Sequence, residues 1–381
     1  MMIRVLQKTA TLGPGGIQTF LVNVQSNLNG VIYDYYLNTL EPDFFTNKVL
    51  SLESKIYGRT RNNGNPISKV LKRYILFYKT IKDKKYYIVH INETVEMTAL
   101  SVIVAKLAGA KVIIAHAHND HASERIAWFR KRIINPISRF INSTFATDHF
   151  ACSKIAAEWF FTKRVAHSNK TLIVNNGIQP EMYSYTIETE KEYRKKLNLG
   201  NSFVLGHVGR FYPQKNHEFI LDVFRELKKM ESNSKLLLIG DGELKDSMKQ
   251  YAFDLEILDD VIFYGVSNEV NKLIQTFNAF IFPSRFEGLG IVAIEAQAAS
   301  LHTFCAEETI AKEVDITEFC HYIPLAEGAK AWAKEILEIA KFYKKRNMCA
   351  EIIAANYDIT SVALMLQNIY TSRGALEHAE E

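Results

Sequence analysis

Two glutamates, Glu287 and Glu295, are separated by seven residues across a glycine-rich turn. The apolar run 279–282 before them predicts a buried strand. Gly288 and Gly290 permit a tight turn, and the apolar residues that follow favour a helix. The N–H groups of a helix start can hold a diphosphate, while carboxylates can accept hydrogen bonds from sugar hydroxyls. The spacing therefore predicts a sugar-nucleotide site, although two glutamates alone could also be a helix-start acid and an exposed helix charge.

Two cations follow another predicted strand. The apolar run 203–208 leads to Arg210 and Lys215, in a loop before a helical pattern. At a strand end, arginine can bind a leaving diphosphate as a planar fork and lysine as a point charge, but a basic surface loop has the same sequence. Gly240 and Gly242 follow a further strand and imitate a dinucleotide-binding turn without its third glycine. The missing glycine argues against an NAD enzyme.

The N-terminal half has its own candidates at strand ends. Gly15 and Gly16 lie directly after the first predicted strand, in a segment that by itself indicates only a turn. His116 and His118 stand at the end of another strand. A metal site at this histidine pair would need further ligands that the sequence does not place. The Asn–Gly pair at 176–177 is typical of a plain turn.

Composition and length indicate a soluble globular protein. The chain has 381 residues, of which 48% are hydrophobic and 23% charged, a length natural for two domains. No apolar run approaches the roughly 20 residues of a membrane helix, and the N-terminus has no cationic leader with a cleavage site. The four cysteines have no paired spacing and predict neither a zinc site nor disulfides. We therefore expect a cytoplasmic protein.

Apolar strands alternate with helical patterns through most of the chain, which is typical of parallel sheets covered by helices on both faces. A polar, charge-rich stretch at 179–201 interrupts the alternation and indicates a domain boundary. We expect an α/β fold of two doubly wound, Rossmann-like domains facing a cleft, an arrangement that suits a two-substrate enzyme. The predicted domains span residues 1–185 and 186–356, and a helix within 357–381 is expected to cross back to the first domain. The predicted strands are 88–91, 111–115, 149–152, 203–208, 235–239, 261–264 and 279–282.

Several of these motifs carry a family resemblance when they are taken in order. Gly209–Arg210 with Lys215, then the 240–242 turn, then the 284–295 segment closely resemble the donor half of retaining GT-B glycosyltransferases of family 4, of the bacterial surface-polysaccharide type. The resemblance is strong over residues 200–300 and loose in the N-terminal half. It implies the two-domain GT-B fold.

The resemblance also implies roles for individual residues. In that family the matching arginine and lysine contact the donor's diphosphate, the first glutamate contacts the donor sugar, the second holds the ribose, and a histidine often contacts the sugar. The implied catalytic residues are Arg210, Lys215, Glu287, His116 and His118, with the choice between the histidines left open. The implied donor-binding residues are Gly15, Gly16, Arg210, Lys215, Gly240, Gly242, Glu287, Gly288, Leu289, Gly290 and Glu295.

One part of the sequence departs from the family pattern. Ser300 and His302 stand where the family usually has glycine and proline. Because they follow the implied contacts, the departure concerns the geometry of a turn more than the chemistry.

The expected activity is transfer of a hexose or N-acetylhexosamine from a nucleotide-diphosphate sugar, with uridine as the default base and with retention of anomeric configuration. We find no convincing nucleophile, so the acceptor is expected to attack on the leaving-group face. No Asp-x-Asp occurs in the sequence. We therefore expect no metal and no cofactor, because cationic side chains and a helix terminus would stabilise the departing diphosphate. The sequence leaves the identity of the sugar open.

Charge is divided unevenly along the chain. Residues 1–180 contain 24 Lys and Arg against 11 Asp and Glu, or +13, while the remainder contains 22 against 31, or −9. The 125–139 and 69–85 segments mix cations with apolar and aromatic residues, as interfacial surfaces do. This predicts peripheral binding to an anionic membrane, on the inner face, and a lipid-linked saccharide acceptor. The residues predicted to bind acceptor or membrane are Arg130, Lys131 and Arg132.

Other functions remain open at this stage. Solvated cationic helix faces would explain the basic half without a membrane. Nucleic-acid binding would also use basic and aromatic residues, but no recognised module appears. A sugar-nucleotide epimerase, a soluble glucan synthase or a non-catalytic scaffold would share the fold and the diphosphate site.

Overall fold

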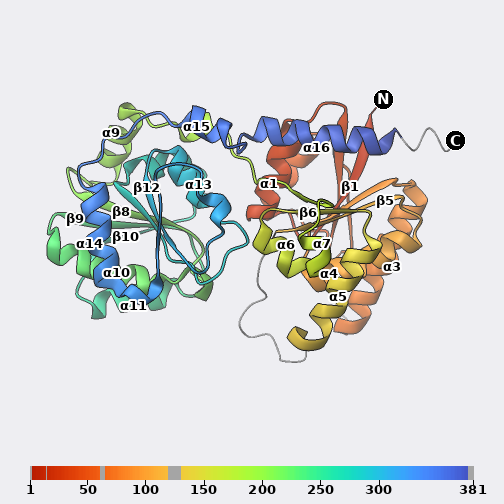
Figure 1. Cartoon of the computed structure of the whole chain (residues 1–381), viewed down its shortest axis with the longest axis horizontal. Helices are drawn as coiled ribbons and strands as arrows, with labels where there is room; N and C mark the ends of the chain where they lie inside the picture. Colours follow the sequence, from red (N-terminus) through yellow and green to blue (C-terminus); the bar gives the residue numbers. More distant parts are fainter. Residues whose placement is uncertain (1, 14, 61–64, 119–129, 376–381) are drawn as a thin grey trace. The chain divides into compact units, whose positions relative to one another are not determined.

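A computed structural model of the chain describes residues 2–13, 15–60, 65–118 and 130–375 (Figure 1). These residues form two compact units, each with its own sheet. The N-terminal unit comprises Met1–Ile178 and Asn356–Glu381, and the C-terminal unit comprises Gln179–Ala355. The first boundary lies at residue 178 rather than at the predicted 185, because helix α8 (Pro180–Tyr183) packs against helices of the C-terminal unit. The chain returns to the N-terminal unit at Asn356.

The described part of the N-terminal unit contains a seven-stranded parallel sheet in the order β3-β2-β1-β4-β5-β6-β7. Its central strands are almost wholly buried, as expected for strands covered on both faces. From the neighbours β1 and β4 the chain continues in opposite directions across the sheet. The strands are β1 (Ile3–Thr9), β2 (Val31–Leu37), β3 (Ile56–Gly58), β4 (Ile88–Ile91), β5 (Val112–Ala117), β6 (Asp148–Ala151) and β7 (Thr171–Ile173).

Helices cover both faces of this sheet. Figure 1 shows α1 and α16 on one face and α3, α4 and α5 on the other, in agreement with the contacts within each group. The helices are α1 (Gly16–Ser26), α2 (Thr46–Ser51), α3 (Pro66–Lys84), α4 (Val95–Leu107), α5 (Asn135–Phe145), α6 (Lys154–Phe160), α7 (Lys163–Ala166) and α16 (Ile359–Gly374), with a π-helical turn at Arg130–Ile134.

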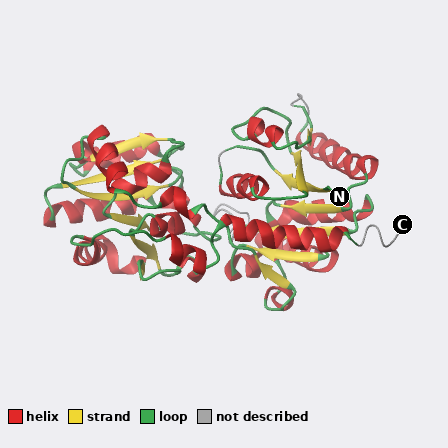
Figure 2. Cartoon of the chain, turned by 90° about the horizontal axis from the view of Figure 1, so that it is seen from above, coloured by secondary structure: helices red, strands yellow, loops and turns green. Residues whose placement is uncertain are grey.

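The C-terminal unit has a six-stranded parallel sheet among its described residues, in the order β10-β9-β8-β11-β12-β13. Figure 2 shows these strands lying between helices. The strands are β8 (Phe203–Val208), β9 (Ser234–Ile239), β10 (Val261–Gly265), β11 (Ala279–Phe282), β12 (His302–Ala306) and β13 (Cys320–Ile323). Besides α8, the helices are α9 (Ile187–Lys196), α10 (His217–Met230), α11 (Lys245–Asp254), α12 (Val270–Leu273), α13 (Ile291–Ala298), α14 (Gly328–Ala340) and α15 (Cys349–Ala354).

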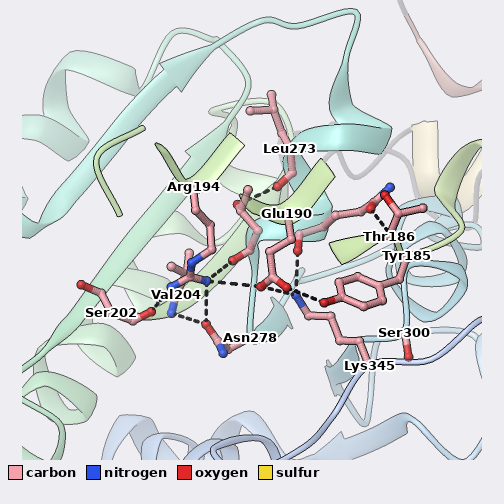
Figure 3. Close-up of polar contacts among 12 residues, drawn as sticks. Tyr185, Thr186, Glu190, Arg194, Ser202, Val204, Leu273, Asn278, Ser300 and Lys345 are labelled. Carbon is pink, nitrogen blue, oxygen red and sulfur yellow. Dashed lines mark hydrogen bonds and ion pairs between the residues drawn. The ribbon is translucent and has the colours of Figure 1, made fainter. Parts of the chain in front are cut away.

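The polar helix α9 is attached to the C-terminal unit by charged side chains (Figure 3). Arg194 donates to the carbonyl of Thr276 at 2.8 Å. Lys345 lies 3.1 Å from Oε1 of Glu190, and Tyr185 donates to Oε2 of the same carboxylate at 2.6 Å. These partners explain how a segment with few apolar residues becomes part of a folded unit.

The C-terminal helix α16 is part of the N-terminal core. It packs against α1, β1, β2 and β4, and its residues Val362 and Leu366 belong to the same apolar cluster as those strands. Tyr370 is fully buried in this cluster. A parallel bridge between Ile178 and Asp358 joins the two chain segments of the unit. The helix therefore completes the hydrophobic core of a unit whose sheet lies more than 180 residues earlier in the sequence.

Candidate active site

The strand order of the C-terminal sheet defines where a ligand should bind. From β8 the chain moves through β9 to β10 on one side, and from the neighbouring β11 it moves through β12 to β13 on the other. Ligands of doubly wound sheets bind beyond the carboxyl ends of the strands at this switch point. The loop after β8 carries Arg210 and Lys215, and the loop after β11 carries Glu287. The predicted charged residues therefore lie on two adjacent loops at the switch point.

Lys215 and Glu287 form an ion pair between these loops. The distance from Nζ to Oε1 is 2.5 Å, and the lysine Nζ also lies 5.0 Å from the ring centre of Phe282. The two side chains are only 17% and 10% exposed, so the pair is shielded from water on most sides. Reduced solvent screening strengthens attraction between the charges. The structure thus brings together two residues that are 72 positions apart in the sequence.

Hydrogen bonds to backbone carbonyls hold the two loops against each other. The side-chain amide of Gln214 donates to the carbonyl of Phe286 at 2.9 Å, and the backbone N–H of Arg285 donates to the carbonyl of Gln214 at 2.8 Å. Asn216 adopts the left-handed conformation, with φ of 57°, and its side-chain amide donates to the carbonyl of Pro283. Asparagine is one of the few residues that accept this conformation readily. The sequence analysis did not predict these hydrogen bonds between the loops, although an asparagine directly before a helix could have indicated a left-handed residue there.

Glycines allow the loops to approach closely. Gly240 has φ of 142°, and a Cβ at this position would lie 2.1 Å from the carbonyl oxygen of Gly209. Gly290 has φ of 90°, and its Cβ would lie 2.6 Å from the Phe282 ring. Gly242 similarly abuts the backbone of Phe211. The glycine-rich turns are therefore required by packing around the switch point, whatever contacts they also make with a ligand.

The remaining predicted residues of these loops differ in exposure. Arg210 is exposed in the loop after β8, with its guanidinium 5.9 Å from the ring centre of Tyr212. Leu289 is buried, so its side chain serves packing. Gly288 and Gly290 lie directly before α13, whose first turn contains no acidic residue. The first turn of α13 therefore adds no carboxylate of its own that would repel a phosphate group.

Glu295 lies in the second turn of α13 and is held by a tyrosine. The hydroxyl of Tyr183, the last residue of α8, donates to Oε1 of Glu295 at 2.7 Å. Burial raises the pKa of the Glu295 carboxyl, and the hydrogen bond from Tyr183 opposes that rise. Sequence patterns did not indicate Tyr183, because it lies 112 residues from its partner.

In the N-terminal unit, the predicted residues gather around the corresponding switch point between β1 and β4. Gly15 and Gly16 form the start of α1, directly after β1, and there is open space where a side chain of Gly16 would lie. His116 is within β5 and His118 follows it, with ring centres 3.9 Å apart. The structure thus places the glycines and the histidines at the same edge of one sheet.

Both histidines are buried and neutral. Burial lowers the pKa of His116 well below its usual value and lowers the pKa of His118 to about 3. Asn92 donates through its amide nitrogen to Gln7, so its oxygen accepts, and the His118 Nε2 at 2.8 Å must carry the proton. Among the described residues, the Nδ1 of His118 and the Nε2 of His116 are buried without a hydrogen-bond partner. A buried ring nitrogen of this kind can still pair with a water molecule or a hydroxyl group.

His116 is also connected to the C-terminal helix. Its Nδ1 lies 3.1 Å from Nε2 of His90 in β4, and Nδ1 of His90 lies 2.7 Å from the hydroxyl of Tyr370 in α16. The Tyr370 hydroxyl lies 3.1 Å from that of Tyr33. Sequence reasoning missed His90, Asn92 and Tyr370, because strand pairing and a helix from the other end of the chain bring them to the site.

The predicted basic patch is described only in part. Residues 125–129 lie outside the described residues, and the side chains of Arg130 and Lys131 in the π-helical turn are likewise outside them. Arg132 is exposed. In the described part of the chain, no helix combines the length and apolar character needed to span a bilayer. No group of three or more His, Cys, Asp or Glu side chains among the described residues is arranged to hold a metal ion.

Comparison with known proteins gives a match over the segment that carries the Lys215–Glu287 pair. Residues 189–355 match the family model described as glycosyl transferases group 1. This segment, less than half of the chain, therefore resembles group 1 glycosyltransferases. It spans nearly all of the C-terminal unit, including β8, β11 and the loops that follow them.

Relatives extend the likeness over the N-terminal unit. EpsF of Bacillus subtilis (strain 168), a protein with a provisional glycosyltransferase name, is 26% identical over 98% of both chains. An Escherichia coli UDP-Gal:alpha-D-GlcNAc-diphosphoundecaprenol alpha-1,3-galactosyltransferase is 26% identical over 61% of both chains. The crystal structure of Anabaena HepE with UDP-glucose has 17% identity and a TM-score of 0.71, covering 97% of this chain and 95% of that one. These matches confirm the predicted pair of Rossmann-like sheets found in GT-B glycosyltransferases.

Proposed function

We propose that this protein transfers a hexose or N-acetylhexosamine from a UDP-sugar to a lipid-linked saccharide, with retention of anomeric configuration, in the synthesis of a capsular, extracellular or other surface glycan. The observation that carries the proposal is the Lys215–Glu287 pair at the switch point of the segment that resembles group 1 glycosyltransferases. The pair combines a cation for phosphate with a carboxylate for sugar hydroxyls.

The relatives support the choice of substrates. The E. coli relative is named for transfer from UDP-galactose to a saccharide on diphosphoundecaprenol. The Anabaena structure contains UDP-glucose. A capsular polysaccharide glycosyltransferase of Staphylococcus aureus is 27% identical over 71% of this chain. A nucleotide-sugar donor and a lipid-linked acceptor are therefore the substrate classes to test first.

At the donor, the chemistry is electrostatic. Departure of the nucleoside diphosphate places negative charge near Arg210, Lys215 and the start of α13. Fixed donors of this kind contribute about 3 to 4 kcal/mol each to transition-state stabilisation. When the diphosphate binds Lys215, the carboxylate of Glu287 loses its ion pair and can accept hydrogen bonds from the sugar. Retention follows from attack of the acceptor on the face that the diphosphate leaves.

Other residues would bind the rest of the donor. Glu295 is proposed to accept hydrogen bonds from the ribose, and the Gly240–Gly242 loop to lie by the base. His118 presents its unpartnered Nδ1 as a hydrogen-bond acceptor for a sugar hydroxyl. The two cations and the start of α13 supply the positive charge that a metal ion supplies in other enzymes, so we propose that the reaction needs no metal.

Membrane binding is proposed for the helices α3, α4 and α5. Leu71 and Ile75 on α3, Leu107 on α4, and Ile137 and Phe140 on α5 are all exposed. The helix α4 contacts both of its neighbours. Together the five apolar residues are called the α3–α5 surface.

Cations accompany the α3–α5 surface. Lys72, Lys79 and Lys82 are exposed along α3, next to its apolar residues. Apolar residues interleaved with cations are typical of helices that lie on anionic lipid, where each Lys or Arg contributes about 1 kcal/mol. This arrangement supports a peripheral position on the inner face of the cell membrane. Sedimentation with anionic vesicles at low and high salt tests it, and absence of binding at both would contradict it.

To test the activity, the protein is given a panel of UDP-sugars together with undecaprenyl-diphosphate-linked monosaccharides. We expect transfer of one sugar, and NMR of the product should show the anomeric configuration of the donor. Inversion would overturn the retaining mechanism. Turnover of the donor without any acceptor would favour an epimerase, and activity that is lost with a chelator and restored by manganese would contradict the metal-free mechanism.

A further inference from the structure

The Glu295 carboxylate has one side-chain hydrogen bond among the described residues, and it comes from Tyr183. The contact uses Oε1, at 2.7 Å. It joins α8 at the start of the C-terminal unit to α13, and these helices also pack against each other. A phenylalanine would fill the same volume between the helices, so the hydroxyl must be explained by what it does for the carboxylate.

Protonation of the two groups fixes the direction of the hydrogen bond. Burial raises the pKa of Tyr183 well above its usual value, so the phenol keeps its proton and donates. Burial also raises the pKa of Glu295, whereas the hydrogen bond from Tyr183 lowers it. The hydroxyl therefore favours the ionised carboxylate, which accepts hydrogen bonds through both oxygens. A protonated carboxyl would have to use one oxygen as a donor and would bind two adjacent hydroxyls less well.

We propose that Tyr183 is a positioning residue for donor binding: it holds the Glu295 carboxylate through Oε1 and leaves Oε2 directed to the ribose hydroxyls of the nucleotide. The inference rests on the proposed function, because it takes Glu295 as the residue that binds the ribose. It adds to that function a residue that touches no substrate and acts through its hydrogen bond alone.

The experiment compares UDP binding by the full chain and its Tyr183→Phe variant, by calorimetry between pH 5.5 and pH 8. Near pH 8 the two dissociation constants should differ least, within about threefold, because high pH favours the ionised carboxylate in both proteins. Towards pH 5.5 the variant should bind progressively more weakly, by up to roughly tenfold, because without the hydroxyl the effect of burial is unopposed and favours the protonated carboxyl. A purely structural role of Tyr183 would instead change affinity by the same factor at every pH.

The chain offers a matched control. Tyr185 also donates its hydroxyl to a glutamate, Oε2 of Glu190 at 2.6 Å, but in the network that attaches α9 (Figure 3). The Tyr185→Phe variant should bind UDP like the unmodified protein throughout the pH range. A second control is 2′,3′-dideoxy-UDP, which lacks the ribose hydroxyls, and its affinity should not depend on Tyr183 at any pH.

A double-mutant cycle provides the decisive outcome. In a Glu295→Ala background, Tyr183→Phe should have no further effect on UDP affinity, because the group through which it acts is gone. Equal affinities of the unmodified protein and Tyr183→Phe at pH 5.5, or an unchanged effect in the Glu295→Ala background, would overturn the inference. If the unmodified protein binds neither UDP nor another nucleoside diphosphate, the proposed function itself fails.

Discussion

The switch points of the two sheets have similar topology but differ in their polar side chains. In the C-terminal unit, Lys215 and Glu287 are charged and paired on loops that hydrogen bonds hold together. In the N-terminal unit, His116 and His118 are buried and neutral, and each has a ring nitrogen without a partner among the described residues. This switch point also contains an ion pair, Lys8–Glu93 at 2.7 Å, but both of its side chains are almost wholly buried.

This difference separates two kinds of chemistry. A diphosphate needs positive charge, which Arg210 and Lys215 present in the loop after β8, whereas the ammonium of Lys8 is already enclosed with Glu93. Sugar and acceptor hydroxyls need neutral acceptors and donors, which buried imidazoles provide without competing for phosphate. Variants that alter one switch point at a time can therefore separate the two tasks.

The largest effect is expected from Lys215→Ala, which removes the buried cation of the charged site. Catalytic efficiency should fall about 100- to 1,000-fold, equivalent to about 3 to 4 kcal/mol of transition-state stabilisation. The measurement is steady-state transfer from the best UDP-sugar. Lys235→Ala is the matched control, because Lys235 pairs with Asp260 at 2.8 Å in the same sheet but outside the site, and it should change the rate less than twofold. A Lys215→Ala enzyme within threefold of normal would remove the charged site from the mechanism.

A smaller effect, on stability, is expected from Tyr370→Phe. The substitution removes the hydroxyl that serves Nδ1 of His90 and Tyr33, and a buried polar group without its partner costs about 1 to 3 kcal/mol. Hydrogen exchange should show faster opening of amides in β4 and α16. Tyr78→Phe is the control, because its hydroxyl contacts only Lys82 on the exposed part of α3 among the described residues. Unchanged exchange in Tyr370→Phe would mean that the histidine network does not depend on α16.

The smallest effect is expected at the neutral site itself. His118→Ala should lower catalytic efficiency by about tenfold, the worth of one hydrogen bond in a buried site. The effect should be constant from pH 6 to pH 8, because burial holds the pKa of His118 near 3 and the ring stays neutral throughout this range. The measurement is the pH profile of both enzymes. A loss confined to one end of the range would show that the histidine acts as an acid or base.

Sequence patterns predicted the parts of the molecule that depend on neighbours in the chain. The runs 88–91, 203–208 and 279–282 form strands with those bounds, since each is a short, continuous apolar segment between turns. The loops with Lys215 and Glu287 were also predicted to carry site residues, because the carboxyl ends of parallel strands meet at one edge of a sheet. Tyr183 and Tyr370 were not found, since their partners lie 112 and 280 residues away and are set by packing.

Ser300 shows how a departure from a family pattern can be accommodated. It has φ of 63°, a conformation that favours glycine, in the turn between α13 and β12. Its hydroxyl contacts that of Tyr343 at 2.8 Å and accepts from the N–H of Arg346 at 2.9 Å. These bonds offset the strain of a side chain in the left-handed region. The sequence pointed to the turn, but the compensating partners lie more than 40 positions further on.

The ion pair between Lys215 and Glu287 has a consequence for selectivity. To bind Lys215, free inorganic phosphate would have to break this ion pair. The Glu287 carboxylate would then remain shielded from water without a counter-charge, which is energetically costly. Under the proposed function, a sugar nucleotide would replace both partners at once, with its phosphate at the ammonium and its hydroxyls at the carboxylate. We therefore expect the unliganded protein to bind free inorganic phosphate weakly.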